Sequence, residues 1–98
     1  MLPCVKQTSR RKAFGNIIVT VINDESFIIG GSVTGTIQLN AWTTIATISD
    51  SDYRPKSQID GIMVESSGIS RQARCRTDGS IQVFGTESIT NPCISISG

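Results

Sequence analysis

Residues branched at Cβ dominate this chain. Isoleucine, valine and threonine together supply 31 of its 98 residues, whereas leucine supplies two and alanine four. Such side chains lose rotamer freedom in a helix and fit the pleated, half-buried surface of a sheet. No stretch combines a helical apolar period with helix start and stop signals. The sequence therefore predicts an all-β fold.

Short runs of alternating apolar and polar residues recur between polar turns. The clearest alternation is 32–39, where Val33, Ile37 and Leu39 fall on one face. We expect about seven short strands at intervals of roughly 8–12 residues, which is typical of an antiparallel β-sandwich or a Greek-key barrel. The expected strands are 17–22, 27–39 with a bend at its paired glycines, 42–48, 59–65, a run ending at residue 77, 80–85 and 93–97.

The chain is long enough for one small domain, whose core must be thin because a short chain buries a small share of its surface. We expect residues 1–14 to form an irregular lead-in that carries four basic side chains, and residues 15–98 to form a single β-sandwich domain. The strand 17–22 is apolar at both odd and even positions. Both of its faces are therefore expected to be covered, by a second sheet or by a neighbouring subunit.

Histidine is absent, and three cysteines occur, Cys4, Cys75 and Cys93. Without histidine, neither a Ser–His–Asp triad nor a Cys–His pair can form within the chain. Three widely spaced cysteines do not supply the paired ligands of a zinc site, and an odd number does not close a disulfide scaffold. We expect three free thiols, with Cys75 buried in a strand, and neither a metal nor a cofactor.

Charge and hydropathy narrow the range of partners. Nine basic and eight acidic residues leave a net charge of +1. A general nucleic-acid binder is normally strongly basic, so we expect no nucleic-acid partner. No signal peptide is visible, and no apolar run approaches the ~18–20 residues of a membrane span. The expectation is a soluble protein, made in a reducing cytoplasm, without membrane insertion.

The acidic residues do not indicate a catalytic site. Asp50 and Asp52 lie two apart in the expected loop 49–57, but the further ligands and the glycine of a calcium loop do not follow. Aspartate and serine in loops more often hydrogen-bond their own backbone, so turn chemistry is the preferred interpretation. A glycosidase needs two carboxyl groups about 5–10 Å apart, and the acidic spacing proposes no such pair. We expect no catalytic residue and no enzymatic activity.

A binding role is easier to support. Small ligands such as saccharides are held by an aromatic face and a few planar polar groups, often on loops between rigid strands. Trp42 and Tyr53 lie at the two ends of one strand-and-loop unit, Arg54 follows Tyr53, and Arg74 shares a strand face with Arg76. Structural roles stay open for all of them. Trp42 can fill the core, Tyr53 and Arg54 can brace the loop, and the other arginines can form a solvated outer face.

Residues 77–80 give the strongest hairpin signal. Asp78-Gly79 lies between two alternating runs, as a two-residue type I′ turn requires, with positive φ at both central residues. Turn chemistry is the main interpretation of Asp78. The other is a saccharide-binding carboxylate at the tip of the hairpin.

One segment resembles a known family as a whole. Residues 42–48 (Trp-Thr-Thr-Ile-Ala-Thr-Ile), a short acidic loop and residues 53–55 (Tyr-Arg-Pro) are similar to the W-x-x-I-A-T-L…gYRP pattern of receptor-binding head domains at the tips of bacteriophage tail fibres and baseplates. The flanks agree, with Gly-Ser-Val-Thr-Gly at 31–35 and an Asp-Gly hairpin followed by a strand at 78–85. The resemblance covers roughly residues 16–98.

The resemblance implies a β-sandwich head that forms a homotrimer and binds a bacterial cell-wall or capsular saccharide. It further implies attachment to other phage tail proteins through an N-terminal shaft missing from this chain. The expected location is the tail tip of the virion, after synthesis in the bacterial host cytoplasm. Residues 48–50 depart from the pattern, because Ile-Ser-Asp replaces the usual Leu-Pro, and the chain also stops earlier than such domains often do. The family has no invariant saccharide-contact motif, so no site residue is carried over.

The functional prediction is a host-recognition adhesin that acts without catalysis. Its candidate ligand-binding residues are Trp42, Tyr53, Arg54, Arg74 and Asp78. Two other classes stay open: a structural or assembly protein of the phage tail that binds other virion proteins, and a glycan depolymerase. Binding to host cell-wall material separates the adhesin from the first alternative, and release of reducing ends identifies the second.

Overall fold

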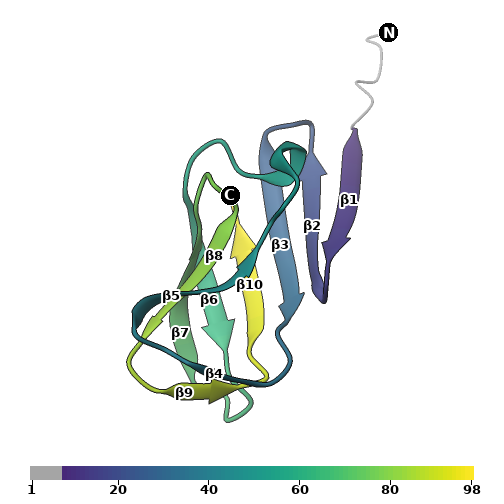
Figure 1. The fold of residues 1–98 in the computed structure, drawn as a ribbon. Coiled ribbons are helices and arrows are strands. Elements are labelled where there is room, and N and C mark those ends of the chain that lie inside the picture. Colours follow the sequence, from purple (N-terminus) through teal and green to yellow (C-terminus); the bar gives the residue numbers. More distant parts are fainter. Residues whose placement is uncertain (1–7) are drawn as a thin grey trace, which may run out of the picture.

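The computed structural model describes residues 8–98, which form ten β-strands and no α-helix (Figure 1). In chain order the strands are β1 (Ser9–Phe14), β2 (Ile17–Ile22), β3 (Ser26–Ser32), β4 (Thr36–Gln38), β5 (Ala41–Thr47), β6 (Ile59–Val64), β7 (Ser70–Cys75), β8 (Ser80–Gly85), β9 (Ser88–Thr90) and β10 (Cys93–Ser97). A single turn of 3₁₀ helix, η1 (Ser51–Tyr53), lies between β5 and β6. The predicted all-β fold class is confirmed for the described residues.

Eight strands form one antiparallel sheet in the order β1-β2-β3-β10-β6-β7-β8-β5, and β4 pairs with β9 in a small second sheet. The last strand, β10, lies in the middle of the large sheet between β3 and β6. The large sheet curls, and the small sheet crosses its lower end in Figure 1. Residues from both halves of the chain therefore meet on each surface of the large sheet.

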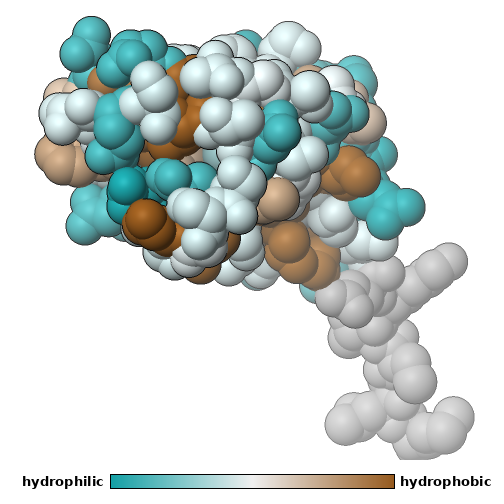
Figure 2. Space-filling view, turned by 90° about the horizontal axis from the view of Figure 1, so that it is seen from below, coloured by the Kyte–Doolittle hydropathy of each residue, from teal (hydrophilic) through white to brown (hydrophobic). Residues whose placement is uncertain are grey.

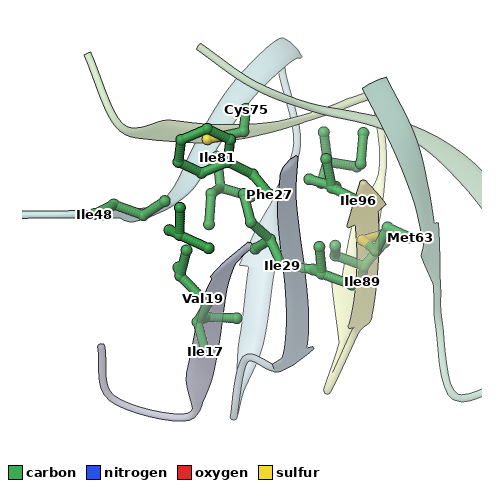
Figure 3. Packing of buried hydrophobic residues seen from close by; sticks show 14 of the residues in the cluster. Ile17, Val19, Phe27, Ile29, Ile48, Met63, Cys75, Ile81, Ile89 and Ile96 are labelled. Carbon is green, nitrogen blue, oxygen red and sulfur yellow. The ribbon is translucent and has the colours of Figure 1, made fainter. Parts of the chain in front are cut away.

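Alternate side chains of the large sheet build one hydrophobic core (Figure 3). In β2, Ile17, Val19 and Val21 are at most 2% exposed, and β8 and β10 repeat this alternation. Leu39, just after β4, and Ile89 of β9 are buried in the same cluster. The small sheet thus closes over the core that the large sheet begins.

The first strand corrects one expectation. Residues 9–14 are not an irregular lead-in, because they form β1 and pair with all six residues of β2. Gly15, at φ +66°, and Asn16 make the two-residue turn between these strands. The run of basic residues hid the strand in the sequence, because it lacks an alternating apolar pattern. Such residues can still form a strand here, since charged side chains are well tolerated on an edge strand. Lys6, the first basic residue of the expected lead-in, lies outside the described residues.

The number of strands also exceeds the expected seven or so. Besides β1, the sequence reasoning did not separate β4 from β3 and did not find β9. Both β4 and β9 have three residues each, and they pair with each other across a long stretch of chain. Strands this short show too little alternation to be recognised locally.

The outer face of the large sheet is open in the single chain. Among the described residues the exposed large hydrophobic side chains are Ile18, Ile28, Ile62, Ile69 and Phe84. Because Ile18 of β2 is 43% exposed, the expectation that both faces of this strand are covered is not met within residues 8–98. From the lower end of the molecule, hydrophobic residues appear in small groups between hydrophilic ones (Figure 2). No helix in the described part of the chain is long and apolar enough to cross a membrane.

Candidate functional site

One half of the outer sheet surface gathers planar polar side chains. It is formed by β6, β7, β8 and β5, which are neighbours in the sheet. The register places Thr44 opposite Gln82, Gln82 opposite Arg74, and Arg74 opposite Asp60. Because the residues that flank Arg74 and Gln82 along their strands are buried in the core, these two side chains face outward. A polar row therefore crosses four strands.

An aromatic pair lies beside this row. Trp42 is opposite Phe84, with their ring centroids 5.3 Å apart and their planes at 62°, an edge-to-face contact. The guanidinium of Arg74 lies 3.8 Å from the centroid of the Trp42 ring, within cation–π range. Phe84 remains 45% exposed. We call Trp42, Thr44, Arg74, Gln82 and Phe84 the Trp42 platform.

Hydrogen bonds hold the platform in place. Arg74 Nε donates to Gln82 Oε1 at 2.8 Å, and Gln82 Nε2 donates to Thr44 Oγ1 at 3.2 Å. These bonds orient the amide and hold the guanidinium over the indole ring. Among residues 8–98, no carboxylate forms an ion pair with Arg74. A guanidinium has five N–H donors, so most of those on Arg74 can serve a ligand.

A surface hollow of about 370 Å³ adjoins the platform and is lined by Trp42, Asp60, Gly61, Gln72 and Ala73. Its volume falls near the lower end of the roughly 300–1,000 Å³ typical of small-molecule sites. Asp60 adds a carboxylate acceptor and Gln72 an amide. The arrangement offers an aromatic surface, donors and acceptors on a rigid sheet, which suits recognition of a polar ligand with apolar ring faces.

Tyr53 lies in a different cluster, next to β1. Its ring makes an edge-to-face contact with Phe14, with the centroids 6.0 Å apart. Arg10 lies 5.4 Å and Lys12 5.9 Å from the centroid of the Tyr53 ring. Arg10 also donates to the backbone oxygen of Asp52 at 2.7 Å. These contacts fasten the edge strand to the loop that contains η1.

Both cations of this cluster are paired with carboxylates. Arg10 bonds to Asp24, and Lys12 Nζ lies 2.8 Å from Asp50 Oδ2. The hydrogen bond from Arg10 lowers the pKa of Asp24, and that from Lys12 lowers the pKa of Asp50. Asp50 Oδ1 also accepts from the backbone N–H of Asp52 at 3.0 Å, which is the turn chemistry preferred above. The name Tyr53 cluster is used below for Arg10, Lys12, Phe14, Asp24, Asp50 and Tyr53.

A second hollow, of about 280 Å³, lies beside Arg10 and Asp24. The two charged groups on its wall already bind each other, so they have little capacity left for a ligand. For this reason the hollow at the Trp42 platform is the better candidate site, although the two are similar in volume.

Arg54 braces its own loop. Its Nε donates to the backbone oxygen of Ile48 at 2.9 Å, and Nη2 donates to that of Ser49 at 3.3 Å. This is the bracing role that the sequence left open. The structure therefore brings Trp42 and Arg74 together and places Arg54 elsewhere, in contact with backbone.

Asp78 lies in a turn whose form corrects the sequence interpretation. Gly79 N donates to Arg76 O at 2.9 Å and Arg76 N donates to Ser80 O at 2.9 Å, so the loop has three residues, 77–79. Only Gly79, at φ +88°, has a positive φ there, which fits a type I turn followed by a glycine bulge. The two-residue type I′ interpretation is wrong, because that turn needs a positive φ at Asp78 as well as at Gly79. Asp78 Oδ1 accepts a hydrogen bond from Ser80 N at 2.9 Å. This hydrogen bond lowers the pKa of Asp78.

Sequence reasoning missed most partners in the Trp42 platform. Alternation along 80–85 does place Gln82 and Phe84 on the face opposite the buried residues, which is a signal that could have selected them. Thr44 and Asp60 carry no such local signal. Their place beside Arg74 depends on which strands are neighbours and on the cross-strand register.

Cys75 and Cys93 are free thiols, as the sequence predicts, and Cys4 lies outside the described residues. Burial raises the pKa of the Cys75 thiol to about 12, and the nearby charge of Asp78 contributes. Cys93 is exposed on β10. In residues 8–98 no three acidic or cysteine side chains are grouped as a metal site requires.

Comparison with known proteins adds no family assignment. No family model matches the chain, and no functionally curated protein matches it either. The functional argument therefore depends on the geometry and chemistry described above and on the sequence resemblance of residues 16–98.

Proposed function

We propose that this chain is a non-catalytic, saccharide-binding head of a bacteriophage tail fibre or baseplate that recognises the bacterial host. The observation that carries the saccharide assignment is the Trp42 platform with its adjoining hollow. The phage assignment is supported by the order of the segments 42–48, 53–55 and 78–85 in the sequence. The proposed target is a cell-wall or capsular saccharide.

The platform offers both kinds of contact that a sugar ring needs. A sugar presents apolar C–H faces and a rim of hydroxyl groups. Since the Arg74 guanidinium lies over the Trp42 ring, the apolar contact falls to the half-exposed Phe84 ring. Hydroxyl groups can pair with the amide of Gln72 and the carboxylate of Asp60, which line the hollow.

The site favours binding over bond cleavage. Glycoside hydrolysis normally uses two carboxyl groups, about 5–10 Å apart, on either side of the scissile bond. The platform and its hollow contribute one carboxylate, that of Asp60. Its ligand-facing groups stand on paired strands of a sheet, so little side-chain or loop ordering is needed on binding.

A homotrimer completes the proposal. One shallow site on a sheet surface binds a saccharide weakly, and several linked sites can raise the overall affinity by a factor of 10² or more when geometry permits simultaneous engagement. In this proposal the assembled head is located at the tail tip and attaches to other tail proteins through its N-terminal side.

The direct test is binding of the purified chain to candidate bacterial cells and to a panel of their purified cell-wall and capsular polysaccharides, with free saccharide as competitor. Phe84→Ala should abolish most of the binding. Ile69→Ala is the matched control, because the exposed fraction of Ile69, 49%, is similar to the 45% of Phe84, and Ile69 lies outside the platform.

Three results would contradict the proposal. Equal binding by Phe84→Ala and the parent protein would remove the platform as the site. Binding to purified tail proteins but to none of the polysaccharides would favour the structural alternative. Release of reducing ends from a polysaccharide would identify a depolymerase.

A further inference from the structure

The other half of the outer sheet surface is uncharged and apolar. It is formed by β2, β3 and β10 with the adjoining part of β6. Not one residue of β2, β3 or β10 carries a charge. Ile18, Ile28 and Ile62 project from this surface and are 43%, 47% and 50% exposed. Exposed isoleucines gathered on one uncharged surface are typical of an interaction site.

The surface has ridges and a trough. In the register Ile18 is opposite Gly30, Gly30 is opposite Ser95, and Ser95 is opposite Ile62. Two small residues therefore lie between two isoleucines. A Cβ at Gly30 would approach only the backbone oxygen of Ile94, at 3.8 Å, so the floor of the trough is open. We call this surface the isoleucine face.

Charged residues border the face on both sides. Arg11 of β1 is opposite the outward-facing Thr20, and Asp60 of β6 is opposite Arg74 at the start of the Trp42 platform. An apolar centre with a polar rim is the usual anatomy of a protein–protein interface. The two borders have opposite charge at their nearest residues, Arg11 and Asp60.

We infer that the isoleucine face docks a second copy of this chain, an inference that rests on the multimeric head proposed above. The occupant must be uncharged where it meets the face and must carry a side chain that fits the trough. A second isoleucine face meets both conditions, since it supplies projecting isoleucines and no charge. When three copies are arranged about a three-fold axis along the strands with these faces inward, the Arg11 border of each copy also lies beside the Asp60 border of the next, where the charges attract.

The first test is sedimentation of the full chain over a range of concentrations. The parent protein is expected to assemble, and Ile28→Lys to sediment as a 10.5 kDa monomer. Because Ile28 is about half exposed, its replacement should leave the fold intact, which the circular dichroism spectrum and the melting temperature check. Ile69→Lys is the control, since Ile69 is 49% exposed and lies outside the face, in the loop before β7. This variant should assemble like the parent.

The native thiol of Cys93 gives a second readout. Cys93 is exposed on β10, opposite Ser32 and Val64, and so lies on the same outer surface. In a Cys4→Ser background, iodoacetamide should alkylate Cys93 at least ten times more slowly in the assembled protein than in Ile28→Lys. Cys75 is buried and serves as the unreactive reference.

Either of two outcomes would overturn the inference: a parent protein that stays monomeric at tens of micromolar, or an Ile28→Lys variant that assembles and protects Cys93 as the parent does. Polysaccharide binding separates this inference from the proposed function. A monomeric Ile28→Lys that retains weak single-site binding supports both. Assembly that Ile28→Lys abolishes, in a protein without any polysaccharide binding, supports the isoleucine face and contradicts the saccharide assignment.

Discussion

Two regions of this protein place a cation over an aromatic ring, and they differ in what else holds the cation. In the Tyr53 cluster, Arg10 and Lys12 lie 5.4 and 5.9 Å from the ring centroid, and each is bonded to a carboxylate. In the Trp42 platform, Arg74 lies 3.8 Å from the ring centroid and has an amide as its hydrogen-bond partner. The first region satisfies its own charge, and the second presents its charge to solvent.

The difference separates a structural cluster from the proposed recognition surface. A cation whose donors are occupied by carboxylates fastens one segment to another, here β1 to the loop that contains η1. A guanidinium that is held by an aromatic ring and one amide is pre-oriented, and its other donors remain unused. In the proposed function the same pair of residue types serves two roles, and the presence or absence of a carboxylate partner decides which.

The largest expected effect is on stability, where the β7–β8 hairpin packs against Ile48 and Arg54. A Cβ at Gly79 would lie 2.4 Å from the backbone oxygen of Ile48 and 3.0 Å from Arg54 Nε, at φ +88°. Gly79→Val should lower the free energy of unfolding by about 3 kcal/mol, the upper end of the cost of a strained backbone position. Urea denaturation measures this loss.

Gly68→Val is the matched control for this change. Gly68 has φ +89° and no atom within 4 Å of an added Cβ, so it reports backbone strain without the clash. Gly79→Val should therefore destabilise the protein more than Gly68→Val. If Gly79→Val unfolds at the same urea concentration as the parent, the hairpin assignment itself is wrong.

The next largest effect should distinguish Arg74 of the Trp42 platform from Lys12 of the Tyr53 cluster. Arg74→Gln removes the group stacked on Trp42 and should weaken polysaccharide binding roughly 5- to 30-fold, which corresponds to about 1–2 kcal/mol. Its melting temperature should change little. Lys12→Gln should do the reverse, lowering the melting temperature and leaving polysaccharide binding unchanged. Calorimetric titration and thermal melts of both variants measure the contrast, and equal behaviour of the two variants would remove it.

Acid should weaken the Tyr53 cluster specifically. The folded-state pKa values of Asp24 and Asp50 are lowered below the ordinary 3.8 by Arg10 and Lys12. At a pH between the folded-state and unfolded-state pKa values, the unfolded chain binds more protons than the folded chain. The stability that the two ion pairs contribute is therefore fully present above pH 4 and is lost as the pH falls further. A double variant, Asp24→Asn with Asp50→Asn, should be less stable at pH 7 and lose less stability below pH 4. An unchanged slope in acid denaturation would count against the two ion pairs.

The smallest expected effect is at Asp78. Asp78→Asn keeps an oxygen that can accept from Ser80 N, so both the urea midpoint and polysaccharide binding should stay close to those of the parent. Lost binding at unchanged stability would instead make Asp78 a ligand contact. That result would extend the recognition surface beyond the Trp42 platform to the hairpin tip.

Whether the sequence could indicate the role of a candidate residue depends on how far along the chain its partner lies. Arg54 contacts backbone only five and six residues away, and Asp78 bonds to Ser80, so their roles are local. The sequence did raise these local roles as alternatives. The contact between Trp42 and Arg74 is different, because β8 lies between their strands. No local pattern reports that arrangement.

The sequence by itself determined which side chains share a face of each strand, because successive side chains in a strand point to opposite sides. That rule located the core residues of β8 and β10, and the Asp-Gly pair separately indicated the glycine that the β7–β8 turn needs. In β2, apolar residues at both odd and even positions hid which face is buried. Only the tertiary structure decided which strands are neighbours. It placed β10 between β3 and β6, turned the basic residues 9–14 into an edge strand, and set Arg74 against Trp42. Strand order depends on burial and backbone pairing between distant segments, and neither is encoded in any single stretch of the chain.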